Sequence, residues 1–232
     1  MVLTDLHAHT SGISRCCHAE YKEIIGAAKE KGIDAIVLTN HYQKSYLRGT
    51  TSEQFIESYI NEYINTKEYA KTQDFKVFWG IEVTMELYPD VHMLIYGTDT
   101  DFLRNNPLLY DMTQQELYDC VKSNSGLLIQ AHPYRNGTAV LDAKYLDGVE
   151  INCHPLYKRS YSRELIKIAE DNGLVLTCGG DYHADTYRPV CGMYIPEETD
   201  NDRDLAEYII SGMGELCIHE PETGEIIKKK FV

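Results

Sequence analysis

Histidine and carboxylate side chains stand at the ends of several short apolar runs in this sequence. The first run leads into Asp5-Leu6-His7-Ala8-His9, and the last leads into Gly180-Asp181-Tyr182-His183. Imidazole and carboxylate groups are ligands that proteins use for Zn, Mn and Fe. The pattern therefore predicts a metal centre. Its candidate ligands are His7, His9, His41, Glu82, His92, His132, Asp181 and His183.

Two pairs of these candidates have the spacing i, i+2. Side chains at this spacing point to the same side of an extended strand, so His7 and His9 can hold one ion together, and Asp181 and His183 repeat the arrangement. Glu82 carries two oxygens and can bridge two ions. Two ions roughly 3.5–4 Å apart can clamp a phosphoryl group and generate hydroxide near neutral pH. The spacing therefore favours metal-assisted hydrolysis.

Short apolar strands and amphipathic helices alternate along the chain, which predicts an α/β fold with a mainly parallel sheet or barrel. The expected strands cover residues 2–7, 33–38, 75–81, 93–96, 127–130, 149–151 and 174–177. The expected helices cover residues 19–31, 52–71, 113–123, 161–172 and 202–211, and residues 215–232 are expected to form a hairpin.

The C-terminal ends of the parallel strands in a barrel meet on one face, which would collect the candidate ligands there. His92 is different because it begins its expected strand. It reaches the same face only if that strand runs antiparallel to its neighbours.

Length and composition restrict the class of protein. The chain has 232 residues, of which 43% are hydrophobic and 25% are charged. These values predict one globular domain over residues 1–232, with residues 214–232 as its C-terminal hairpin tail. The net charge of −14 argues against a general attraction to nucleic acid or to an anionic membrane.

The cysteines predict an environment that keeps thiols reduced. All seven are scattered without a CxxC pair, and the N-terminal residues lack a basic segment followed by a long apolar run. We therefore expect a cytoplasmic protein. No stretch approaches the roughly 20 apolar residues of a membrane span, so we expect no membrane partner. The oligomeric state has no signal in the sequence.

The order of these motifs resembles the polymerase and histidinol phosphatase (PHP) family over roughly residues 3–195. The motifs are Asp5-Leu6-His7-Ala8-His9-Thr10, Leu38-Thr39-Asn40-His41, Gly80-Ile81-Glu82, His92-Met-Leu-Ile-Tyr96-Gly97, Ala131-His132-Pro133, Gly148-Val-Glu150 and Gly180-Asp181-Tyr182-His183. The resemblance implies a distorted seven-stranded β/α barrel of the TIM-like, PHP type. It also implies a phosphoesterase with two or three ions of Zn, Mn or Fe.

The resemblance implies three ion sites, two of which share Glu82 as a bridge. Their ligands are His7, His9, Glu82 and Asp181 for the first ion, Glu82, His92 and His132 for the second, and His41 and His183 for the third.

Two departures from the family pattern concern the third ion. Many members have an acidic residue in the loop after the HxH motif, where this chain has Arg15-Cys16-Cys17-His18. Cys16, Cys17 or His18 could replace it, since thiolate and imidazole both suit Zn. The alternative, which the sequence favours, is a structural loop and a weak or absent third ion. The second departure is Asn40, where family members often have an Asp. The amide of Asn40 has no negative charge to place beside His41.

The expected reaction is hydrolysis of a phosphate ester by a hydroxide that bridges two ions. We assign the catalytic roles to Asp181, His183 and Glu82, with His183 or a metal-bound water protonating the leaving alkoxide. Arg135, Arg188 and Arg15 are the candidate contacts for the substrate phosphate.

The substrate itself is open from the sequence. A small phosphorylated molecule is expected, and the net charge disfavours a nucleic-acid end.

Two other functions fit parts of the pattern. A metal-dependent amidohydrolase also carries HxH after its first strand, although such enzymes often bridge their ions with a modified lysine. No lysine stands at an expected strand end here. A catalytically inert relic with a structural or regulatory role would require lost ligands, whereas the first two ion sites are complete.

Overall fold

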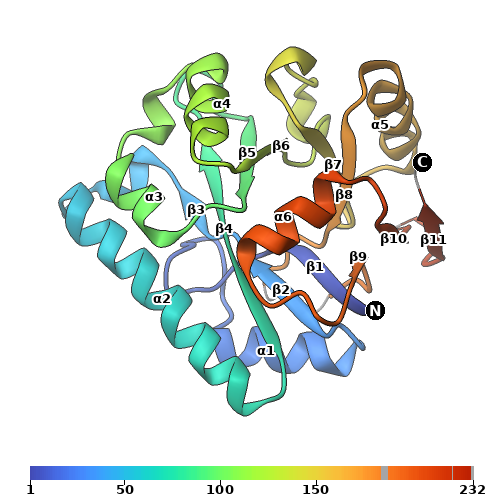
Figure 1. Ribbon diagram of the computed structural model, residues 1–232, viewed down its shortest axis with the longest axis horizontal. Coiled ribbons are helices and arrows are strands. Elements are labelled where there is room, and N and C mark those ends of the chain that lie inside the picture. The colour runs from blue at the N-terminus through green and yellow to red at the C-terminus, as the bar shows by residue number, and fades with distance from the viewer. Residues whose placement is uncertain (184–187, 221, 231–232) are drawn as a thin grey trace.

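A single curled sheet with helices packed around it organises the chain (Figure 1). The computed structural model describes residues 1–183, 188–220 and 222–230. The strands are β1 (Val2–Ala8), β2 (Ala35–Leu38), β3 (His41–Tyr42), β4 (Lys76–Thr84), β5 (His92–Tyr96), β6 (Leu127–Gln130), β7 (Gly148–Asn152), β8 (Val175–Gly179), β9 (Gly192–Ile195), β10 (Glu215–His219) and β11 (Ile226–Lys230). The helices are α1 (Tyr21–Glu30), α2 (Ser52–Thr72), α3 (Thr100–Asn105), α4 (Gln114–Ser123), α5 (Arg159–Asn172) and α6 (Asp202–Ile210).

The strand order in the sheet is β11-β10-β9-β1-β2-β4-β5-β6-β7-β8, and β3 pairs with β4 beside this path. The sheet curls until the end of β8 reaches β1. Ala8 and Tyr182 form an isolated parallel bridge there, and the Asp181 amide donates to the His7 carbonyl at 2.9 Å. This contact brings the HxH and DxH motifs together.

The expected seven-stranded barrel is only partly correct. The fold is mixed α/β, but the sheet is a curled half-barrel that β9, β10 and β11 extend beyond β1. Between β8 and β1 the described residues form one bridge instead of a continuous ladder. The antiparallel pairing of β9 with β1 explains the difference, because it uses the edge of β1 that a closed barrel would give to β8.

Strand direction settles the question raised by His92. Parallel pairs join β1 to β2, β2 to β4, β6 to β7 and β7 to β8, whereas β5 runs antiparallel to both β4 and β6. His92, the first residue of β5, therefore pairs with Thr84 at the C-terminal end of β4. The antiparallel arrangement that His92 needed is confirmed.

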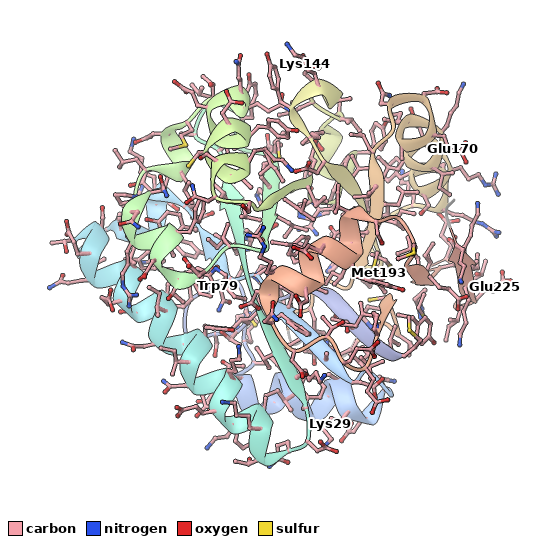
Figure 2. All side chains as sticks on the ribbon, in the orientation of Figure 1. Lys29, Trp79, Lys144, Glu170, Met193 and Glu225 are labelled. Carbon is pink, nitrogen blue, oxygen red and sulfur yellow. The ribbon has the colours of Figure 1, made fainter. Side chains whose placement is uncertain are left out.

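The helices begin where the sequence has capping residues, and they bury one face. Thr51 and Thr113 each accept a hydrogen bond from the backbone amide at the third helical position, which starts α2 and α4. In α2 the buried face includes Tyr59 and Tyr63, whose rings pack on Trp79 of β4 with centroids 5.5 and 5.1 Å away. Figure 2 shows Trp79 within the molecule, whereas Lys29 and Lys144 lie at its periphery. Packing of this kind fixes α2 against the sheet.

Short elements were harder to predict than long ones. The hairpin expected in the tail is confirmed by the antiparallel pairing of β10 with β11. No element is predicted from the sequence at α3, β3 or β9, whose lengths are six, two and four residues. Within the described part of the chain, no helix combines the length and apolarity required to cross a membrane.

Candidate metal centre

All eight predicted ligands come together at one end of the curled sheet. Strands β1, β3, β4 and β5 carry four of them, and the segments directly after β1, β6 and β8 carry the rest. His7, His9, Glu82 and Asp181 have no more than 1% of their surface exposed. His92 and His183 are partly exposed, with 18% and 16% of their side chains accessible. The cluster therefore has a buried floor and an accessible side.

The two oxygens of Glu82 face two different sets of imidazoles. Oε1 lies 2.8 Å from His92 Nδ1 and 3.1 Å from His132 Nε2. Oε2 lies 2.7 Å from His41 Nδ1, and His9 and His7 present their Nε2 atoms to it at 3.3 and 3.4 Å. A carboxylate placed in this way can bridge two cations.

Asp181 supplies the second carboxylate. Its Oδ1 lies 3.0 Å from His9 Nε2, 3.3 Å from His7 Nε2 and 3.5 Å from His183 Nδ1. Three groups of side chains have ligand atoms within 4.8 Å of one another. These groups are His7, His9, Glu82 and Asp181; His41, Glu82 and His92; and His9, His41 and His183.

The first of these groups has the membership predicted for the first ion. In the second, His41 stands where His132 was expected, although His132 also contacts Glu82. In the third, His9 joins the expected His41 and His183. The individual ligand assignments remain predictions.

One pair of buried atoms shows that this donor set fits cations. His41 Nδ1 and Glu82 Oε2 approach to 2.7 Å, but neither has a hydrogen-bond partner of acceptable geometry among the described residues. Leaving buried polar atoms unsatisfied is costly, so such atoms call for another partner. A metal ion held by the imidazole nitrogen and the carboxylate oxygen would satisfy both.

The surroundings favour the charged form of both carboxylates. Burial raises the pKa of Glu82, but the charges of His41, His7 and His92 outweigh it, and the pKa lies well below its usual range. Burial also raises the pKa of Asp181, but the charges of His7 and Arg135 outweigh this effect, and the pKa of Asp181 also lies well below its usual range. Burial, reinforced by His183 and His41, lowers the pKa of His9. Anionic carboxylates and neutral imidazoles bind metal ions, so His7 and His41, whose pKa values the nearby carboxylates raise in spite of burial, must release a proton when an ion binds.

Sequence reasoning missed two residues that orient the ligands. Glu150, fully buried in β7, lies with its Oε1 2.9 Å from His7 Nδ1, and its Oε2 accepts the His132 backbone amide at 3.0 Å. Ser14 Oγ lies 3.0 Å from His9 Nδ1. Both contacts direct the Nε2 atom of the histidine toward the centre. The signal for Glu150 was a charge inside an apolar strand, whereas Ser14 had none.

We predict that Glu150→Gln weakens zinc binding by about 10- to 100-fold, as loss of such supporting partners usually does. Competition with a chelator of known affinity measures the effect. Glu170→Gln is the control, because Glu170 is exposed on α5 (Figure 2). Equal zinc affinities for the two variants would show that Glu150 does not support His7.

The three predicted substrate arginines lie in different surroundings. Arg135 contacts Asp181 and keeps 18% of its side chain exposed. Arg15 lies at the rim, where its guanidinium is 4.8 Å from the ring centroid of Tyr46.

Arg188 differs from the other two arginines. It was a candidate contact for the substrate phosphate, but it is 6% exposed, and its Nη2 donates to Asp5 Oδ2 at 3.1 Å. Its guanidinium also stacks on Tyr182 at 4.4 Å. The physical reason is the buried Asp5 carboxylate, which requires a cation beside it.

Cys16 lies in the loop that follows His9 and has an exposed side chain. Partial burial raises the pKa of its thiol, but hydrogen bonding with His183 and His41 lowers it to about 5. The Sγ atom is also 3.9 Å from the Tyr46 hydroxyl. The neighbouring Cys17 is oriented differently, with its Sγ directed at the carbonyls of His9 and Ala19.

The fold and the site define a metal-binding α/β domain. The family model described as the PHP domain matches residues 5–215, and the chain belongs to this family.

Three solved structures share the fold. A two-domain protein from Bacteroides vulgatus, described as containing a predicted PHP-like metal-dependent phosphoesterase, has a TM-score of 0.68 and 16% identity, over 94% of this chain and 65% of that one. The lesion-specific endonuclease Q from Pyrococcus furiosus has a TM-score of 0.64 and 15% identity, over 96% and 60%. An amidohydrolase from Chromobacterium violaceum has a TM-score of 0.55 and 13% identity, over 88% and 96%. The chain thus spans less than two thirds of the first two proteins, and the likeness concerns the fold.

Proposed function

We propose that this chain is a metal-dependent phosphoesterase. The observation that carries the proposal is Glu82, whose two oxygens face separate sets of imidazoles at 2.7–3.4 Å. Such a carboxylate suits a pair of ions. When bound, two or three ions of Zn, Mn or Fe supply Lewis-acid activation of water and of phosphoryl oxygens. Membership of the PHP family supports hydrolysis in general.

The remaining roles follow from the side chains around the ions. Arg135, partly exposed beside Asp181, is placed to bind a phosphate oxygen and to offset charge in the transition state. His183 Nδ1 contacts the Asp181 carbonyl oxygen at 2.9 Å, which leaves Nε2 for an ion or for the leaving oxygen. Arg15 at the rim is a secondary contact for a longer substrate.

We favour a small phosphorylated molecule as the substrate. The net charge of −14 gives no general attraction to a polyanion, and the ligands with least exposure lie deep in the curled sheet. The structural neighbour endonuclease Q acts on a DNA lesion, so a nucleic-acid end is the alternative within the same reaction class.

A substrate screen with metal-loaded protein tests the proposal. Protein stripped with a chelator and reloaded with Zn, Mn or Fe is offered phosphomonoesters, phosphodiesters, nucleotides, an abasic DNA duplex and amides. Phosphate-ester hydrolysis that requires the metal is the expected result. Hydrolysis of amides alone would favour the amidohydrolase alternative, and a metal-loaded protein inactive on every substrate would favour the inert relic.

Arg135→Ala should lower kcat/KM for the preferred phosphate ester by about 10- to 100-fold, the usual cost of losing a charged hydrogen bond. Arg203→Ala is the control, because Arg203 pairs only with Glu207 on the exposed side of α6 among the described residues. Metal content is measured for both variants. An unchanged kcat/KM in Arg135→Ala with full metal content would remove Arg135 from substrate binding.

A further inference from the structure

Left-handed backbone conformations gather in two segments that carry the metal centre. Among the residues that the structure describes, six other than glycine have a positive φ, and four of these lie in the segments after β6 and β8. The four are His132, Tyr134, Asn136 and Asp181, with φ between 29° and 72°. Such conformations cost free energy, and they persist only where the surrounding contacts hold them.

Tyr134 is the most unusual of the four. Its φ is 72°, a value that bulky side chains rarely adopt, whereas Asn and Asp adopt it several-fold more often. Tyr134 stands between Pro133 and the short 3-10 turn Arg135–Gly137. A glycine or an asparagine would fit this backbone at lower cost. The tyrosine side chain must therefore contribute something that the turn itself does not require.

The ring of Tyr134 packs on the first turn of α5. Its centroid lies 5.5 Å from that of Tyr161, and the Tyr161 centroid lies 5.3 Å from that of Tyr157. Tyr134 and Tyr161 are partly exposed, whereas Tyr157 is 1% exposed, so the three rings form a row from the surface into the core. This row anchors the segment after β6 to the adjacent helix.

Hydrogen bonds fix the same segment on either side of Tyr134. The Arg135 amide donates to the His132 carbonyl at 3.2 Å, and Thr138 donates to the Arg135 carbonyl from its amide and its hydroxyl at 3.2 and 2.9 Å. The side-chain amide of Gln130 donates to the Ala139 carbonyl at 2.8 Å. The backbone that carries Arg135 is thus held at both ends by hydrogen bonds and at Tyr134 by a ring contact.

This arrangement determines where the Arg135 guanidinium lies. It contacts the buried Asp181 carboxylate, and 18% of the Arg135 side chain remains accessible. A long side chain loses conformational freedom when it is held in one geometry, and a mobile backbone would add to that loss. Anchoring the segment before the substrate arrives therefore favours phosphate binding by Arg135.

We propose that Tyr134 is a positioning residue. Its ring, packed on Tyr161, holds the left-handed turn that directs Arg135 at Asp181 and at the phosphate of the substrate. The inference rests on the proposed function and deepens it, because it identifies the contact that fixes the phosphate-binding arginine. Tyr134 acts through Arg135 and needs no contact of its own with the substrate.

Tyr134→Asn tests the ring contact, because asparagine tolerates the left-handed backbone and the turn can still form. We expect kcat/KM for the preferred phosphate ester to fall by about 10-fold, within the range that misplacing an orienting group costs. The dissociation constant of inorganic phosphate from the zinc-loaded protein should rise by a similar factor. Tyr134→Phe keeps the ring and should restore both values.

A double-mutant cycle tests the route through Arg135. In a protein that already carries Arg135→Ala, Tyr134→Asn should cause almost no further loss, because the two residues act as a unit. Asp74→Asn is the matched control. Asp74 also has a left-handed backbone, with a φ of 51°, but it precedes β4 at the end opposite Glu82. It should leave kcat/KM unchanged. Zinc content and the urea midpoint of unfolding are measured for every variant.

Two results would overturn the inference and leave the proposed function in place. One is an unchanged kcat/KM and phosphate affinity in folded, zinc-loaded Tyr134→Asn. The other is an equal loss with and without Arg135, which would mark a merely structural role. If the unmodified zinc-loaded protein hydrolyses no phosphate ester, the proposed function fails, and phosphate affinity alone decides the inference. Equal affinities in the unmodified protein and Tyr134→Asn, or no phosphate binding by either, would then overturn it.

Discussion

Glu82→Gln should abolish metal-dependent hydrolysis, with kcat/KM falling by roughly a thousandfold or more. The amide removes the negative charge and one of two acceptor oxygens, so it cannot join the sets of imidazoles that Glu82 now faces. Metal ions contribute several kcal/mol to the stabilisation of a phosphoryl-transfer transition state, and each 1.36 kcal/mol is about tenfold in rate. Steady-state kinetics at saturating metal measure the loss.

The control for this prediction is Glu86→Gln, an exposed residue shortly after the same strand. It should keep both the activity and the metal content of the unmodified protein. Circular dichroism verifies that Glu82→Gln is folded. A folded Glu82→Gln protein with undiminished kcat/KM would contradict the bridging role.

Asp5→Asn should lower the free energy of unfolding by about 3–5 kcal/mol, the typical cost of leaving one member of a buried ion pair without its partner. Asp5 is fully buried and accepts from Arg188 and from the amides of His7 and Gly180 at 2.9–3.1 Å. Burial raises the pKa of Asp5, although Arg188 opposes it. Asparagine keeps an acceptor for the amides but leaves Arg188 uncompensated.

Urea unfolding of the chelator-treated proteins measures this effect without a contribution from bound metal. Asp111→Asn is the matched control, since the Asp111–Lys44 pair is exposed and should contribute little to the free energy of unfolding. If Asp5→Asn loses no more stability than Asp111→Asn, the buried pair does not hold the base of the site together.

The sequence was sufficient to place the candidate ligands on one face because their positions follow from strand periodicity. His7 and His9 share one side of β1 and the segment after it, and Glu82 lies near the end of β4, so the pattern of apolar runs placed them on one face. The placement of His92 on that face depended on the direction of its strand. The antiparallel pairing of β5 with β4 brings His92 to the same face.

The residues that the sequence misplaced or missed depend on partners far along the chain. Arg188 pairs with a carboxylate 183 positions away, and Glu150 with a histidine 143 positions away. No local periodicity encodes such contacts. The same reason applies to β9, whose four residues are too short for a pattern and are defined by pairing with β1 and β10.

Elemental analysis of protein purified without a chelator tests the central claim most directly. A centre bridged by Glu82 predicts two or more moles of Zn, Mn or Fe per mole of chain. The Glu82→Gln variant should retain less metal under the same conditions. Less than about half a mole per chain, persisting after reloading with zinc or manganese, would contradict the metal centre and with it the proposed phosphoesterase.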